Sequence, residues 1–443
     1  MNQPSHSTVT LLFLAAAVTL TAPQALQGQS LTLAAAAESA LGSHPTVQSA
    51  AAHVNAADET LAAARAARIP SLGATVNLTR FQEPMVVAPF HSFDPVNPPG
   101  FDRTLLQGQV GVAYTVFDAG ARSARIEGAG AIAEATRLGS EATEMVLIEQ
   151  VASTYVGVLS ARAVLDAATR LVAAVDAEGA RAQRHFDAGT AAEVAVLRAS
   201  AALQDARAQL ATAEARVGLA ERSLARVMGV PADVVTGRDL ADVAVTGADA
   251  AISIAGSPIL RQAGRVVEAS EAVLAEQRAG RLPKLDMKAG IADFATLTGD
   301  HVTEWQAGLQ MTLPFFTGGT RRAAIRRAQA GVVAARSDMA ATELALLSAV
   351  DVAETAVTET QGRALALEAA VAQWTEVARI EALALDAGSG LQSDLLRAQA
   401  GLYQSPSGHA RARYDNVLAR VSMARTRGTL DMNWLNEVLE IRP

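Results

Sequence analysis

The chain of 443 residues contains no cysteine. This absence excludes disulfide bonds, zinc sites built on cysteine, thiol catalysis and attachment of a lipid to an N-terminal cysteine. The seven histidines are scattered, and none forms an H-x-x-x-H pair or follows a glycine-rich nucleophile turn. A P-loop is also missing, because "FTGGTRR" lacks the lysine and the spacing of that motif. We therefore expect no enzyme: no catalytic residues, no metal ligands and no cofactor.

Aromatic side chains and clustered positive charge are scarce as well. Only 4% of the chain is aromatic although 50% is hydrophobic, because alanine supplies much of the apolar content. Aromatic side chains fill thick globular cores, so this composition favours thin, closely packed helices. The net charge is −8 and the arginines are interspersed with acidic residues. Nucleic-acid binding needs clustered basic charge, so no nucleic-acid partner is expected.

Long apolar runs are missing too, apart from a short one near the N-terminus. Residues 9–20 form an apolar run that is followed by small and polar residues. A membrane-spanning helix needs about 20 apolar residues, whereas a secretory signal needs fewer. We expect residues 1–28 to be a signal peptide, with cleavage between residues 22 and 29. The alternative is a buried N-terminal helix.

What the chain does contain is one unit written twice. Phe117 and Phe316 are separated by 199 positions, and so are Gly120 and Gly319. "ATE", "DAG" and "LRA" return at the same separation without any insertion. Repeats at a fixed separation indicate a duplicated structural unit. The expected parts are a signal peptide, a first repeat, a linker, a second repeat and a tail, at residues 1–28, 30–229, 230–256, 257–428 and 429–443.

Four segments alternate between apolar and polar residues and predict strands. Trp305, Leu309 and Met311, for example, alternate with glutamines and a glycine. We expect four strands of about ten residues, in hairpins at residues 71–117 and 284–316, a length typical of tilted transmembrane strands. A half-buried sheet of a soluble protein is the alternative. Residues 81–102 are rich in proline and are predicted to be a loop.

The remaining sequence predicts long helices with a seven-residue repeat. Heptads typical of a left-handed coiled coil run through residues 151–175 and 203–227 of the first repeat. In the second of these runs, one seam holds larger side chains and the other holds alanines: Leu203, Leu210, Val217 and Leu224, and Ala206, Ala213 and Ala220. Gly189 interrupts the helical pattern, and Thr190 with Glu193 is interpreted as a capping box that begins the next helix. Each half should therefore hold a long antiparallel helical hairpin, on the order of 100 Å in length.

Four membrane strands cannot close a barrel by themselves. Sheets that span a membrane must close, and small single-chain barrels need at least about eight strands. If the strands lie in a membrane, several chains must therefore combine. Two copies would supply eight strands and three copies twelve.

The order of these parts resembles the TolC-like outer-membrane efflux proteins. The resemblance rests on the signal, the duplicated order of hairpin and long helices, "LPFFTGG" at residues 313–319 and "DAGS…SDLLRAQ" at residues 386–399. It implies an α+β membrane protein that forms a homotrimer, with a twelve-stranded transmembrane β-barrel in outer-membrane lipid and a periplasmic barrel of twelve helices. It also implies that residues 230–256 and 429–443 form a belt around the middle of the helices.

The same resemblance implies an exit duct of a tripartite efflux or type I secretion system. Such a duct conducts cargo passively, and its partners are a periplasmic membrane-fusion adaptor and an inner-membrane pump of the resistance-nodulation-division or ABC type. The alternative function is a soluble periplasmic adaptor or scaffold built on coiled-coil hairpins.

Three groups of residues take expected roles from the resemblance. The adaptor-docking turns at the helical tips are Asp187, Gly189, Thr190, Asp386, Gly388 and Ser389. The candidates near the aperture are Asp394, Arg397, Arg198 and Glu193. The strand-to-helix seam comprises Phe117, Gly120, Phe316, Gly318 and Gly319. An ordinary pair on one helix face is the alternative for Asp394 and Arg397.

Overall fold

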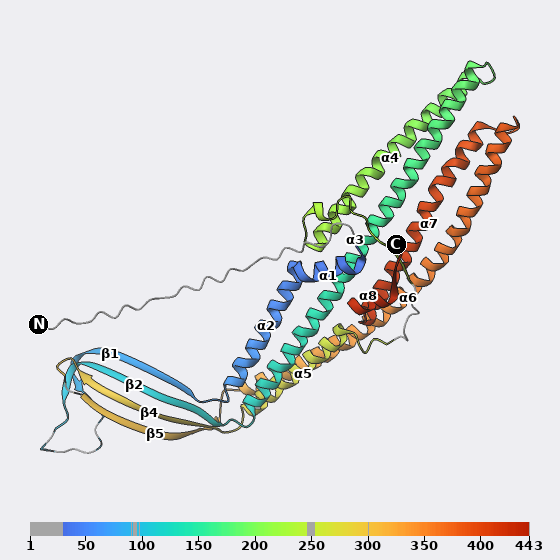
Figure 1. Ribbon diagram of the computed structural model, residues 1–443. Coiled ribbons are helices and arrows are strands. Elements are labelled where there is room, and N and C mark those ends of the chain that lie inside the picture. Colours follow the sequence, from blue (N-terminus) through green and yellow to red (C-terminus); the bar gives the residue numbers. More distant parts are fainter. Residues whose placement is uncertain are drawn as a thin grey trace, which may run out of the picture.

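The computed structural model describes residues 30–89, 91, 95–96, 98–245, 253–299 and 301–442. The expected signal peptide lies outside the described residues, and so does part of the expected linker. Figure 1 shows a β-sheet at one end of an elongated molecule and two helical hairpins that reach the other end. Within the described chain, no helix combines the length and the hydropathy needed to cross a membrane.

The four expected strands form one antiparallel sheet. They are β1 (Ser71–Val86), β2 (Phe101–Phe117), β4 (Lys284–Thr296) and β5 (His301–Thr312), and they lie in the order β1-β2-β4-β5. Together with the long helices described below, this sheet confirms the predicted fold class. At 12 to 17 residues, the strands are longer than the ten residues expected.

One face of this sheet is apolar and the other is polar. The register places Leu72 opposite Val112 and Val110 opposite Ile291, and it continues from Ile291 to Trp305. Several of these side chains are exposed, Trp305 by 79% and Leu72 by 73%. On the other face Thr75 lies opposite Gln109. The two outer strands, β1 and β5, each have a partner on one side only.

The expected loop at residues 81–102 is shorter than predicted. β1 continues to Val86 and includes Pro84, and β2 begins at Phe101. Proline is tolerated in an edge strand or at a bulge, because no ladder hydrogen bond is lost there. β1 is an edge strand, and its register shifts between Arg80 and Met85. Proline excludes a strand at the centre of a sheet, but it does not exclude an edge strand such as β1.

Two helical hairpins of equal size follow the sheet. The first comprises α3 (Ala121–Asp187) and α4 (Glu193–Met228), and the second comprises α6 (Thr320–Asp386) and α7 (Gln392–Arg427). In both hairpins the helices have 67 and 36 residues, and every boundary recurs 199 positions later. α3 packs against α7 and joins the hairpins. At 1.5 Å per residue, the longer helix reaches about 100 Å.

Shorter helices complete the half of the helical part nearer the sheet. α2 (Pro45–Ala66) packs on α3, and α5 (Pro258–Ala279) lies between α3 and α6 (Figure 1). Within the first hairpin the alanine seam is the buried one, since Ala206 and Ala213 are each 2% exposed while Leu203 and Leu210 are only partly buried. Small side chains let the two helices approach closely, as the heptads predict.

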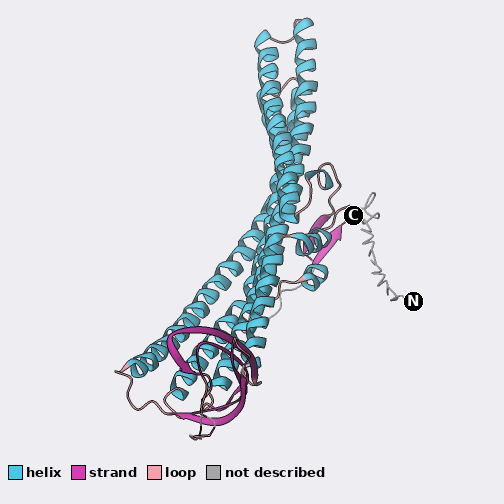
Figure 2. Cartoon of the chain, turned by 90° about the vertical axis from the view of Figure 1, so that its left-hand side faces the viewer, coloured by secondary structure: helices cyan, strands magenta, loops and turns pink. Residues whose placement is uncertain are grey.

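The main core lies at the middle of the long helices, in a region that we call the waist. There α3, α4 and α7 pack against α1 (Leu33–Ser43), β3 (Asp242–Val245), α8 (Met432–Val438), β6 (Leu439–Arg442) and Val235, which follows the 3-10 turn Ala232–Val234. β3 and β6 pair in antiparallel fashion, which joins residues on either side of the second repeat. Figure 2 shows these two short strands on one side of the helix bundle. Beneath them, the buried hydroxyl of Tyr155 lies 2.6 Å from the carbonyl oxygen of Leu31 and 2.7 Å from that of Ala241.

Candidate functional site: seams, tips and duct wall

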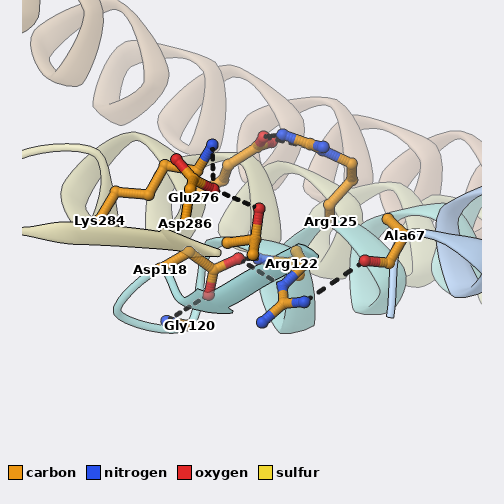
Figure 3. Close-up of polar contacts among 9 residues, drawn as sticks. Ala67, Asp118, Gly120, Arg122, Arg125, Glu276, Lys284 and Asp286 are labelled. Atoms are coloured by element: carbon orange, nitrogen blue, oxygen red, sulfur yellow. Dashed lines mark hydrogen bonds and ion pairs between the residues drawn. The ribbon is translucent and has the colours of Figure 1, made fainter. Parts of the chain in front are cut away.

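The first seam turns the chain from β2 into α3 by means of a carboxylate cap. Asp118 accepts hydrogen bonds from the backbone N–H groups of Gly120 at 3.2 Å and Arg122 at 3.1 Å. The guanidinium of Arg122 donates to the same carboxylate at 2.8 Å and to the carbonyl of Ala67 at 3.4 Å (Figure 3). Helix N-termini leave backbone donors unsatisfied and favour negative charge. The cap therefore stabilises the start of α3 and connects it to the segment after α2.

Two further contacts brace this seam against the second repeat. Thr115 donates to Asp286 of β4 at 2.7 Å, and Lys284 lies 3.1 Å from the same carboxylate. Arg125 and Glu276 connect α3 and α5 at 2.5 Å (Figure 3). The turn itself depends on backbone conformation, since Gly120 has φ +90° and Ala119 has φ +55°. The seam thus connects β2 and α3 to the end of α2, to β4 and to α5.

The second seam turns by a different arrangement. β5 ends at Thr312, and Leu313 and Pro314 lie outside the strand. Gly318 and Gly319 adopt positive φ angles of +59° and +87° before α6 begins. Phe315 and Phe316 are 91% and 89% exposed, whereas Phe117 of the first seam is 53% exposed. The repeat mate of Asp118 is Thr317, which cannot supply a carboxylate cap.

The first tip turn lies between α3 and α4. Gly189 has φ +71°, and its N–H donates to the carbonyl of Phe186 at 2.8 Å. Thr190 does not form the expected capping box with Glu193: its hydroxyl instead donates to the carbonyl of His185 at 2.9 Å, and Ala192 precedes α4 without a side-chain cap. The left-handed glycine reverses the chain so early that Thr190, although outside α3, satisfies a carbonyl of its last turn instead of starting α4. Asp187 accepts from Gln183 at 2.8 Å.

The second tip turn has the same backbone. Gly388 has φ +74°, and Ser389 donates through both its N–H and its hydroxyl to the carbonyl of Ala384, at 3.0 and 3.2 Å. Gly390 is required by space, because a Cβ atom there would lie 2.7 Å from the backbone nitrogen of Leu385. Asp386 is exposed at the end of α6.

The aperture candidates lie in the first two turns of α4 and α7. Asp394 and Arg397 form an ion pair at 3.6 Å within α7, with side chains 42% and 82% exposed. Glu193 and Arg198 are exposed on α4. The geometry is thus that of a pair on one helix face, and an additional role at an aperture stays a prediction.

Contacts between the hairpins near the tips were not expected from the sequence. Arg181 of α3 pairs with Asp386 of α6 at 2.6 Å. Gln392 of α7 donates to Glu178 of α3 at 3.3 Å, and Glu178 is buried. No local pattern indicates these partners, since more than 200 residues separate each pair.

A second unexpected set of polar contacts fastens the waist to the helices. Arg413 of α7 donates to Asp242 of β3 at 2.7 Å, and the hydroxyl of Tyr414 donates to the same carboxylate at 3.0 Å. Arg162 of α3 donates to both Glu221 and the carbonyl of Arg238, each at 2.7 Å. Burial raises the pKa of the Tyr155 and Tyr414 hydroxyls. In the part of the chain that the structure covers, no cluster of three or more metal-ligating side chains occurs.

Comparisons with known proteins agree with this architecture. The family model described as "Outer membrane efflux protein" matches residues 36–230 and 252–429. The outer membrane protein TolC of Vibrio cholerae is 25% identical over 419 residues, which cover 87% of this chain and 88% of that protein.

Solved structures share the fold. The outer membrane protein VceC of Vibrio cholerae superposes with a TM-score of 0.76 at 19% identity, covering 89% of this chain and 96% of that one. The CmeC outer membrane channel of Campylobacter jejuni gives a TM-score of 0.76 at 14% identity, covering 90% and 87%. None of these similarities supports the alternative of a soluble adaptor. The chain belongs to the outer membrane efflux protein family and is an exit duct of the outer membrane with a periplasmic helical part.

Proposed function

We propose that three copies of this chain close one continuous duct, which conducts cargo passively from a periplasmic adaptor and an inner-membrane pump to the exterior. The observation that carries the proposal is the open sheet with an exposed apolar face. β1 and β5 are both edge strands, and an open edge cannot lie in lipid because its backbone groups would lack hydrogen-bond partners. Joining β5 of one copy to β1 of the next removes every edge, and the family resemblance favours three copies.

The helical part supports the same assembly. α6 is an edge element of each copy and exposes large apolar side chains along its length, among them Leu344 and Val352, which are 68% and 66% exposed. A contiguous exposed apolar surface of this kind marks a contact surface. In a closed ring, α6 of one copy would lie against α2 and α4 of the next.

The tips are the proposed place for the partners. Both turns lie at the end of the molecule farthest from the sheet (Figure 1), where a periplasmic adaptor can reach them. Their residues are exposed, Asp187, Gly189 and Thr190 in one turn and Asp386, Gly388 and Ser389 in the other. We further propose that Asp394, Arg397, Arg198 and Glu193 surround the opening between the tips.

Fractionation tests the assembly. The protein should remain with the outer membranes after a salt wash, dissolve only in detergent, and migrate without boiling at about three times the mass of the boiled chain, which is 45.8 kDa before removal of the signal peptide. Recovery in the soluble periplasmic fraction, or a monomer under gentle extraction, would exclude the proposed duct.

A pair of substitutions tests which sheet face meets lipid. Leu309 lies on the exposed apolar face of β5, and Gln310 follows it on the polar face. An arginine on the lipid face costs about 2–4 kcal/mol near the membrane midplane. Leu309→Arg should therefore reduce the heat-labile trimer recovered from membranes, while Gln310→Arg should leave it unchanged. Equal effects of the two substitutions would mean that the sheet is not lipid-facing.

A further inference from the structure

A cavity of about 250 Å³ lies between the middle parts of the long helices. Its walls come from both repeats, with Arg216 on α4 and Arg411 on α7, and its floor is the surface of α3 between them. Ser153, Gly157 and Ser160 supply this floor.

The cavity touches the waist core through Val156 and Tyr414, but most of its α3 lining lies on the side of that helix that faces away from the waist. Val151, Tyr155 and Val158 of α3 are buried in the waist core. With 3.6 residues per turn, Ser153, Gly157 and Ser160 fall on the opposite side of the helix. Figure 2 shows that the waist strands occupy one side of the bundle only. In the proposed trimer, the cavity side is therefore the side that faces the lumen.

The charges at this cavity are predominantly positive. Arg216 and Arg411 are both exposed, and within the described chain neither guanidinium has an ion pair or a hydrogen bond. One carboxylate, that of Asp415, also lines the cavity, and it is held 2.5 Å from Arg363. Arg363 in turn lies 3.3 Å from Glu359. The two cavity arginines therefore remain without a neutralising partner.

We propose that this cavity is a binding subsite for organic anions on the inner wall of the duct. Guanidinium groups bind carboxylate, sulfonate and phosphate oxygens with paired hydrogen bonds, and two of them on facing walls suit a small molecule with two anionic groups. The serine hydroxyls add donors beneath it. Three copies would place six such arginines around the lumen, a charge arrangement that raises the local concentration of anionic cargo.

Binding can be measured without any transport. The probe is benzene-1,3-disulfonate, titrated by calorimetry into the full-length protein in detergent. We expect about one site per chain, with roughly tenfold weaker binding for Arg216→Gln and for Arg411→Gln, since loss of one charged contact commonly changes affinity by that factor. The uncharged benzene-1,3-disulfonamide should not bind.

A matched control separates the site from general positive charge. Arg222→Gln removes an exposed arginine from the same helix at a position that does not line the cavity, and it should leave the affinity unchanged. Absence of binding to the wild-type protein, or equal weakening by all three substitutions, would overturn the proposal.

The inference rests on the proposed function only for the direction in which the cavity faces. In planar bilayers, the disulfonate should reduce the current through the wild-type channel more than through the double variant of Arg216 and Arg411 to glutamine. Disulfonate binding together with an absence of any conductance would contradict the duct and leave the subsite standing. Normal conductance without disulfonate binding would contradict the subsite alone.

Discussion

Ala119 and Gly120 show how one residue pair turns a strand into a helix. Both adopt positive φ, +55° and +90°. The repeat mates of the pair are Gly318 and Gly319, also at positive φ. A residue with a Cβ atom pays a steric cost of about 1–2 kcal/mol in the left-handed region. The alanine in the first seam is held there by its neighbours, including the Asp118 cap.

Substitution at this corner should be asymmetric. Gly120→Ala is expected to destabilise the protein by about 1–2 kcal/mol because φ +90° is unfavourable for alanine. Ala119→Gly should be neutral or mildly stabilising, since relief of strain is offset by about 0.4–1 kcal/mol of unfolded-state entropy. Thermal unfolding followed by circular dichroism measures both. A larger loss for Ala119→Gly than for Gly120→Ala would contradict this account.

Trp374 and Gly401 form a complementary pair inside the second hairpin. A Cβ atom at Gly401 would lie 2.4 Å from the ring of Trp374. In the first hairpin, the same two positions are occupied by Val175 and Ala202, which pack in one cluster. In the second hairpin, the large side chain of Trp374 is thus accommodated by the absence of a side chain at Gly401.

Gly401→Ala should therefore destabilise the protein by about 1–3 kcal/mol through overpacking. The double variant Gly401→Ala with Trp374→Val recreates the pair of the first hairpin and should recover much of the loss. The midpoint of thermal unfolding reports both effects. If the double variant is no more stable than Gly401→Ala alone, the clash with the tryptophan is not the cause.

At the residue scale, the sequence predicts the glycines that adopt positive φ but not the partners of the polar side chains. Gly189, Gly319 and their mates were predictable because a break in a helical pattern needs a residue that tolerates positive φ. The bond of Thr190 to His185 was not, since the same letters also fit a capping box. The contacts of Arg181 and Arg413 connect positions far apart in sequence, which no local pattern encodes.

At the scale of elements, the two hairpins are held together near their tips by the Arg181–Asp386 pair. It joins α3 of one hairpin to the end of α6 in the other. A partly exposed ion pair contributes at most about 1 kcal/mol. That is small for folding, but it is sufficient to bias the distance between two long arms.

Arg181→Ala should loosen this contact and increase the open fraction of single channels by up to about fivefold, the population change that corresponds to about 1 kcal/mol. Arg170→Ala is the matched control, because Arg170 pairs with Asp166 of its own helix. Single-channel recording in planar bilayers measures the open fraction. Identical gating of both variants would show that the pair does not restrain the tips.

The ends of the long helices were the most predictable boundaries of this chain. The constant separation of 199 positions locates each helix end twice, so an uncertain end in one repeat is fixed by its mate. The alternation of residues 304–313 likewise predicted which side chains share a face of the sheet. The strand around Pro84 was not predicted, because proline is tolerated there only since β1 is an edge strand. The position of a strand in its sheet is not a property of the sequence around it.

For the whole molecule, the waist is the one place where segments from the N-terminal side, the middle and the C-terminal end of the described chain share a core. Tyr155 lies at its centre and is fully buried. Its hydroxyl lies within hydrogen-bond distance of the carbonyl oxygens of Leu31, before the first helix, and Ala241, between the repeats. None of this follows from periodicity, because the contributing segments are short and lack a repeating pattern.

Tyr155→Phe should lower the free energy of unfolding by about 1–3 kcal/mol, since the buried carbonyl of Ala241 loses its hydroxyl donor. The carbonyl of Leu31 keeps the backbone N–H of Ala241. Tyr403→Phe is the control, because Tyr403 has no hydroxyl hydrogen bond among the described residues. Burial raises the pKa of Tyr155, so its contribution is present below the ordinary tyrosine value of about 10 and is lost as the pH rises above it. Thermal unfolding at pH 7 and above pH 10 tests both statements. If both variants lose the same free energy of unfolding, the hydrogen bonds of the Tyr155 hydroxyl do not stabilise the waist.

The equal lengths of the two hairpins have a consequence for recognition. With helices of 67 and 36 residues in each repeat, three copies would end in a level rim of six tips. The backbone of that rim repeats every 60°, but its chemistry repeats only every 120°, because Ala195 and Arg198 alternate with Asp394 and Arg397 around the circle. A docking protein that grips only the turns can settle in six orientations. A docking protein that also contacts the charged side chains can bind in only three orientations. The alternation of charge therefore determines its rotational alignment on the duct.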